Sequence, residues 1–163
     1  MKKAIFVLLA TILAVSAIFL GWQVSRVTAK ESKILEFDTM AGLPQALTGA
    51  QNPIRGINGG GLPWAIGPTS GELKKDGKLE IKVQGLVFSA GPNTGRNTVP
   101  AFRAIVSCLK NDGSVENIST DQFPATEEGN AKIEAKLNLP ESCLAPIIFV
   151  TSPGGAWFAT TGY

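Results

Sequence analysis

Residues 70–88, SGELKKDGKLEIKVQGLVF, constrain the fold most, because they encode two strands joined by a tight turn. Apolar and polar residues alternate from 78 to 84, and a period of two places the apolar side chains on one face of a sheet. Asp76-Gly77 lies between the two runs and predicts a hairpin turn, since glycine adopts a positive φ at little cost. Asp112-Gly113 repeats this pattern and predicts a second hairpin.

Short strand patterns continue along the chain, separated by Gly, Pro and Asp turns. Residues 102–109 are nearly all apolar or small, which predicts an interior strand covered on both faces. Residues 131–139 alternate cleanly, which predicts one buried and one solvated face. Weaker patterns cover residues 34–40, 62–66, 115–118, 146–151 and 157–160. We therefore predict an all-β fold, an antiparallel β-sandwich (Ig-like) or small barrel of about seven to nine strands, after an N-terminal signal helix.

The N-terminus has the pattern of an export signal. Lys2-Lys3 precede an apolar run over residues 4–22, and Val27-Thr28-Ala29 has the small residues that a signal peptidase recognises. We expect residues 1–29 to be a signal peptide and residues 30–163 to be a single domain. Because the apolar run would extend about 28 Å as a helix, an uncleaved membrane anchor stays an alternative. Both interpretations place the domain outside the cytoplasm.

Charge and cysteine content indicate which partners and which compartment are compatible with the chain. Without residues 1–29 the chain keeps 12 of its 15 basic residues against 13 acidic ones, interspersed, which argues against nucleic-acid partners. The two cysteines, Cys108 and Cys143, are expected to form a disulfide in an oxidising compartment. The disulfide would close a loop of about 36 residues and contribute roughly 4 kcal/mol in the chain-entropy model.

The chain contains no histidine, which excludes Ser-His-Asp and Cys-His catalysis and histidine-ligated metal sites. Acidic residues that lie close in sequence, Glu36 with Asp38 and Asp121 with Glu127 or Glu128, are interpreted as solvated surface charges. Turn chemistry explains Asp112 and its neighbours better than a calcium site does. We therefore expect no catalytic residue, metal or cofactor, and a protein that is not an enzyme.

Aromatic and glycine residues give the candidate ligand-binding site. Trp64 and Trp157 lie next to Gly/Pro turns, where a half-exposed ring could stack on a sugar. The alternative is that both rings close the ends of the core. Residues 41–61 form a long loop, a functional or packed Ω-type element, that ends in Gly59-Gly60-Gly61. These glycines lack the pattern of a phosphate-binding loop, and backbone room beside Trp64 is the simpler explanation.

Several segments together resemble a group of small exported bacterial proteins that lack an assigned activity. They are FDTMAGLP, PIRGINGGGLPW, GELKKDGKLEIKVQGL, FRAIVSCL and APIIFVTSPGGAWFATTG, and they cover most of residues 34–162. The resemblance implies export and one domain, and no catalytic residue.

The leading hypothesis is a secreted, non-enzymatic protein with a surface-binding or structural role and an extracellular partner, either a polysaccharide or a component of the cell envelope. The alternatives are a carbohydrate-binding or carbohydrate-active module that uses Trp64 and Trp157, and a membrane-anchored envelope protein. The membrane is a partner only in the anchored form.

Overall fold

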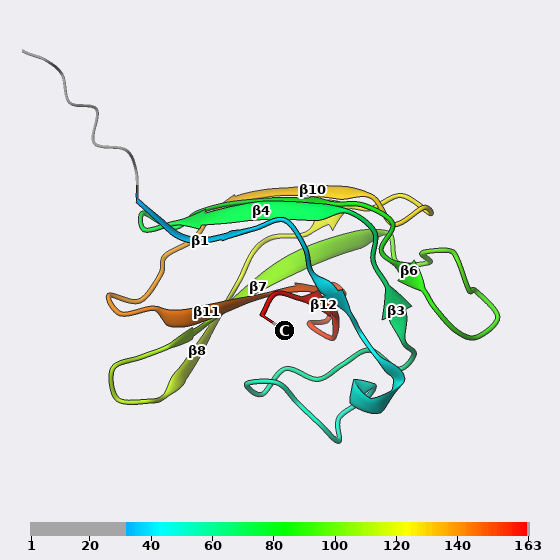
Figure 1. Ribbon diagram of the computed structural model, residues 1–163, viewed down its shortest axis with the longest axis horizontal. Coiled ribbons are helices and arrows are strands. Elements are labelled where there is room, and N and C mark those ends of the chain that lie inside the picture. Colours follow the sequence, from blue (N-terminus) through cyan, green and yellow to red (C-terminus); the bar gives the residue numbers. More distant parts are fainter. Residues whose placement is uncertain (1–31, 163) are drawn as a thin grey trace, which may run out of the picture. The chain divides into compact units, whose positions relative to one another are not determined.

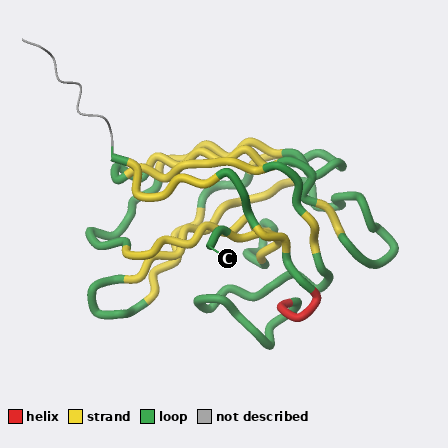
Figure 2. Tube along the Cα trace, in the orientation of Figure 1, coloured by secondary structure: helices red, strands yellow, loops and turns green. Residues whose placement is uncertain are grey.

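The computed structural model describes residues 32–162, which contain twelve β-strands and one short 3₁₀ helix joined by loops (Figure 1, Figure 2). The predicted signal segment and its cleavage after Ala29 lie outside these residues and stay a prediction. Within residues 32–162, no helix is long and apolar enough to cross a membrane.

Sheet A has four antiparallel strands in the order β1-β4-β5-β10. The strands are β1 (Lys33–Phe37), β4 (Thr69–Lys74), β5 (Lys78–Val83) and β10 (Ala131–Lys136). Hydrophobic side chains point from β5 and β10 to one face of this sheet, as the alternation predicts. Charged side chains point to the other face.

The turn between β4 and β5 is the predicted hairpin. Gly77 has a φ of 89°, and its N–H donates to the Lys74 carbonyl at 2.9 Å. The Asp76 carboxylate accepts from the Lys78 N–H at 3.0 Å. A side chain at Gly77 would collide with the Leu137 carbonyl, so both the backbone angle and the available space require glycine here.

Sheet B has the order β2-β12-β11-β7-β8, and β9 pairs with the start of β7. Its strands are β2 (Ala41–Gly42), β7 (Ala101–Leu109), β8 (Val115–Ser119), β9 (Phe123–Pro124), β11 (Leu144–Thr151) and β12 (Trp157–Thr160). A separate pair joins β3 (Trp64–Ala65) to β6 (Val87–Phe88). The predicted interior strand is confirmed, because β7 pairs with β11 on one side and with β8 on the other and is buried along most of its length.

The main core fills the space between the two sheets, which Figure 1 shows as two layers. Buried side chains at alternating positions of β5, β10, β7 and β11 contribute to it: Leu79, Ile81, Val83, Ile133, Phe102, Val106, Ile148 and Val150. The sheets are antiparallel and do not close into a barrel, so the all-β sandwich is the correct form of the prediction. The structure has more strands than the expected seven to nine because it includes strands of only two residues, such as β2 and β9.

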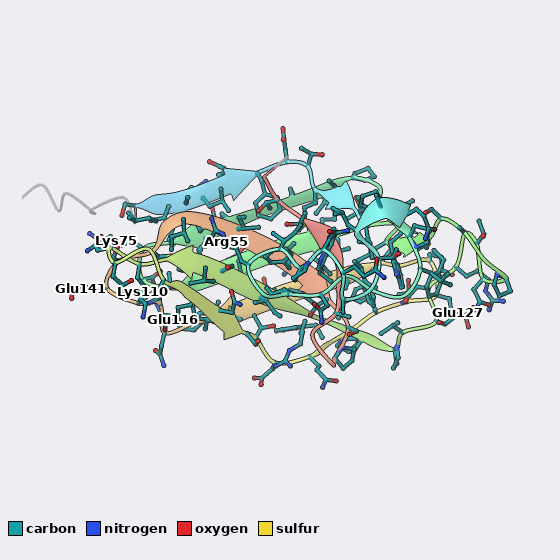
Figure 3. The ribbon with its side chains drawn as sticks, turned by 90° about the horizontal axis from the view of Figure 1, so that it is seen from below. Arg55, Lys75, Lys110, Glu116, Glu127 and Glu141 are labelled. Carbon is teal, nitrogen blue, oxygen red and sulfur yellow. A yellow bond between two sulfur atoms is a disulfide. The ribbon has the colours of Figure 1, made fainter. Side chains whose placement is uncertain are left out.

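Residues 41–61 cover the side of sheet B that faces away from sheet A (Figure 1). The segment contains β2 and a single 3₁₀ turn, η2 (Gln45–Leu47). Arg55 fastens it, since Nη1 donates to the Ser107 carbonyl at 2.8 Å and Nη2 to the Ala145 carbonyl at 2.9 Å. These carbonyls belong to β7 and β11 where their register shifts, and Figure 3 shows Arg55 over sheet B. The long loop is therefore a packed element.

Candidate functional site

The outer face of sheet A carries charged side chains in rows that cross the strands. Side chains paired across neighbouring strands point to the same side of a sheet, so the register decides which charges become neighbours. One glutamate from each strand joins what we call the glutamate row: Glu36, Glu72, Glu80 and Glu134.

Lysines lie on both sides of the glutamate row. Toward the β4–β5 turn is the lysine row, formed by Lys33, Lys74, Lys78 and Lys136. On the opposite side is what we call the groove row, formed by Asp38, Ser70, Lys82 and Lys132. Lys82 pairs in register with both Ser70 and Lys132, and Asp38 directly follows the pair formed by Phe37 and Gly71.

Ion pairs between rows offset the repulsion within each row. Lys33 Nζ lies 2.6 Å from Glu36 Oε1 and 2.8 Å from Glu72 Oε2, and Lys78 Nζ lies 2.6 Å from Glu80 Oε1. The hydrogen bonds to Glu36 and Glu72 raise the pKa of Lys33 to about 12. The hydrogen bond from Lys33 lowers the pKa of Glu72, and the one from Lys78 lowers the pKa of Glu80. Glu72 and Glu80 are therefore ionised at neutral pH and held by lysines outside the groove row.

A groove of about 1150 Å³ lies on this face, over the glutamate row and the groove row. Strands β1, β4, β5 and β10 supply most of its lining, and Pro124 of β9 adds to it. Its polar lining consists of four carboxylates, two lysines, a hydroxyl and two amides: Glu36, Asp38, Glu72, Glu80, Lys82, Lys132, Ser70, Gln84 and Asn130. The groove is open to solvent, whereas residues 41–61 cover the outer face of sheet B at β7, β11 and β12 and leave β8 exposed.

Two charges in the groove have no ion-pair partner among residues 32–162. Lys82 is one of them, although Lys132 beside it contacts Glu134 at 2.6 Å. Asp38, at the β1 side of the same row, is the other. Across the sheet, the groove row thus presents a free carboxylate, a hydroxyl, a free ammonium group and a paired one.

The tryptophans predicted from sequence lie elsewhere. Trp64 is 3% exposed and Trp157 is fully buried. Trp64 stacks on Phe158 with ring centroids 4.0 Å apart, and its centroid lies 4.1 Å from that of Phe88. Neither indole presents a face to solvent, so the alternative in which both rings complete the core describes their placement.

The predicted glycines separate into two kinds. Gly59 bridges to Trp157, and a side chain on Gly60 would press against the Phe158 ring and come within 3.4 Å of Trp64 Nε1. Backbone room beside Trp64 is therefore the correct interpretation for Gly60. Gly61 is exposed, and a side chain there would meet nothing within 4 Å.

The predicted disulfide between Cys108 and Cys143 is confirmed, with Cα atoms 4.6 Å apart. It ties buried β7 to the turn that precedes β11. Of the acidic residues considered from sequence, Glu36 and Asp38 line the groove, while Glu127 pairs with Arg96 at 2.6 Å. Within residues 32–162, no three potential metal ligands come together.

Comparisons with family models, curated proteins and solved structures give no match. The resemblance to small exported bacterial proteins therefore stays a prediction. A functional proposal for this chain accordingly rests on the geometry of sheet A.

The ion pairs on sheet A predict that acid destabilises the fold. Pairing with Lys33 lowers the pKa of Glu72 below its ordinary 4.5, and the Lys136 hydrogen bond lowers the pKa of Asp76 below 3.8. The folded chain thus binds fewer protons than the unfolded chain, so these groups stabilise it above pH 4.5. That stability is lost as pH falls through the lowered values.

Urea midpoints measured from pH 7 to pH 2.5 test this dependence. We expect the midpoint to fall below pH 4.5, and to fall less in Glu72→Gln than in the wild type. Glu141→Gln is the matched control, because Glu141 has no ion-pair partner within residues 32–162. If the urea midpoints of all three proteins fell equally in acid, the loss of stability could not be assigned to the ion pair of Glu72.

Proposed function

We propose that the protein is a non-enzymatic binding protein that acts outside the cytoplasm and holds its partner in the groove of sheet A. One observation carries the proposal: the outer face of sheet A is open and hollowed, whereas residues 41–61 cover the outer face of sheet B at β7, β11 and β12. Ligand sites in proteins are concave and carry a few convergent polar groups. The groove row provides such groups.

Export is supported by the N-terminal signal pattern and by the disulfide, because disulfides persist in oxidising compartments. The membrane-anchored alternative differs only in whether the signal segment is retained. N-terminal sequencing of the exported protein distinguishes the two, since a start at Lys30 removes the anchor.

A non-enzymatic role is supported by the charge state of the groove. General acid catalysis by a carboxylate needs a raised pKa near the working pH, which burial or a like charge produces. Here the pKa values of Glu72 and Glu80 are lowered by lysines. With no histidine in the chain, Glu72 and Glu80 are suited to holding a ligand and not to donating a proton near neutral pH.

Filling the groove tests the proposal. Ser70→Trp places a large ring on its floor, and Ser119→Trp is the matched control on exposed β8 of sheet B. Co-sedimentation with purified cell-envelope polysaccharide measures binding, and circular dichroism checks the fold. We expect Ser70→Trp to lose binding and Ser119→Trp to keep it. Equal binding by the two folded variants would refute the groove as the binding site.

A further inference from the structure

We propose that the groove row binds an acidic saccharide and that Lys82 holds the anionic group of this ligand. The inference rests on the proposed function of the groove and adds the chemical class of the ligand. It is carried by the charges, hydroxyl and amides that the register brings together.

Lys82 supports an anionic ligand. Other lysines of this face contact carboxylates: Lys33, Lys74, Lys78, Lys132 and Lys136. Lys82 has no ion-pair partner in the described part of the chain, and it lies in register between the Ser70 hydroxyl and a second lysine. A carboxylate in the groove would gain a charge-assisted hydrogen bond from Lys82 and a second bond from Ser70, and such charge-assisted bonds are about twice as strong as neutral ones.

The other polar groups in the groove indicate that the anionic group belongs to a saccharide. Asp38 only accepts hydrogen bonds when ionised, so it suits a ligand with hydroxyl donors. The Asn130 side-chain oxygen already accepts from the Gly85 N–H at 3.0 Å, which leaves the Asn130 amide NH₂ for a ligand acceptor. Gln84 adds a further donor and acceptor. A sugar acid carries hydroxyls and a carboxylate on one ring and matches this set.

An acidic peptide matches the groove less well. Extended peptides bind through backbone hydrogen bonds to a free strand edge. Strands β4 and β5, at the centre of the groove, have neighbours on each side, so only the edge strands β1 and β10 have a side without a strand neighbour. Recognition at the centre of the groove depends on side chains, which suits the many hydroxyls of a saccharide. Because Trp64 and Trp157 are buried, neither indole stacks on the ligand, and charge and hydrogen bonds carry the recognition.

Isothermal titration calorimetry tests the inference by comparing the affinities of an oligogalacturonate and of its neutral methyl ester. We expect the acid to bind about tenfold or more tightly than the ester, because the ester loses the charge-assisted contact. Lys82→Met should weaken binding of the acid by a similar factor. Lys75→Met is the matched control, since Lys75 is exposed at the β4–β5 turn and does not line the groove.

The outcomes separate this inference from the proposed function. Equal binding of acid and ester, lost in Ser70→Trp, would overturn the anion site and keep the groove. Binding of an acidic peptide without binding of the oligogalacturonate would replace the saccharide with a peptide. No binding of either saccharide would overturn the inference, while the co-sedimentation experiment would still decide on the groove. Equal loss in Lys82→Met and Lys75→Met would show general charge attraction and would also overturn it.

Discussion

Replacing both cysteines with alanine is expected to lower the free energy of unfolding by about 4 kcal/mol. Cys108 and Cys143 are 35 residues apart, and the chain-entropy model assigns roughly this value to closing such a loop. The link also holds β11 to β7 close to where their register shifts between Leu144 and Ile147. Urea denaturation of the wild type and of Cys108→Ala/Cys143→Ala measures the difference. Alanine is the suitable replacement because Cys108 is fully buried.

Reduction of the wild-type disulfide is the control for this prediction. A similar loss of stability on reduction assigns the effect to the cross-link. If the double variant unfolds at the wild-type midpoint, the cross-link does not stabilise the fold.

Trp64→Ala is expected to cost about 3–5 kcal/mol, the range for removing a large aromatic from a core. The Trp64 ring is packed between Phe88 and Phe158, and the backbone N–H of Trp64 donates to the Leu43 carbonyl at 2.9 Å. Because Trp64 does not line the groove, the fraction that stays folded should bind the ligand as the wild type does. Chemical denaturation and titration of the same sample give both values.

Leu62→Ala is the matched control, since Leu62 lies two residues from Trp64 and is 38% exposed. It should change stability by much less. A Trp64→Ala variant that keeps its stability but loses binding would support the tryptophan hypothesis and contradict the placement of the ring in the core.

Periodicity is enough to predict most of the scaffold. The hairpin of β4 and β5, the interior position of β7 and the two faces of β10 follow from alternation and turn chemistry. The pairings of β2 and β9 cannot be predicted in this way, because two residues contain no period. Nor does any local pattern indicate that Arg55 reaches carbonyls 52 and 90 residues away.

The groove cannot be predicted from the sequence for a different reason. Alternation assigns Lys78, Glu80 and Lys82 to a solvated face, and a single strand gives no sign of what lies across from it. The sequence does contain a usable signal, since Lys132, Glu134 and Lys136 repeat the same spacing on another strand. Antiparallel pairing of the two repeats places like charges opposite one another. Only that pairing reveals the charged rows, the groove on this face of the sheet, and the absence of an ion-pair partner for Lys82 among residues 32–162.

The cover that residues 41–61 form over sheet B also protects a strand edge. Each residue of β12 is buried, and on the side away from β11 this strand is bonded to β2 and to residues 58–60. Local opening or proteolytic cleavage of the cover would turn Trp157–Thr160 into a free apolar edge, which is a template for intermolecular strand pairing. We therefore expect detachment of this one long loop to promote aggregation.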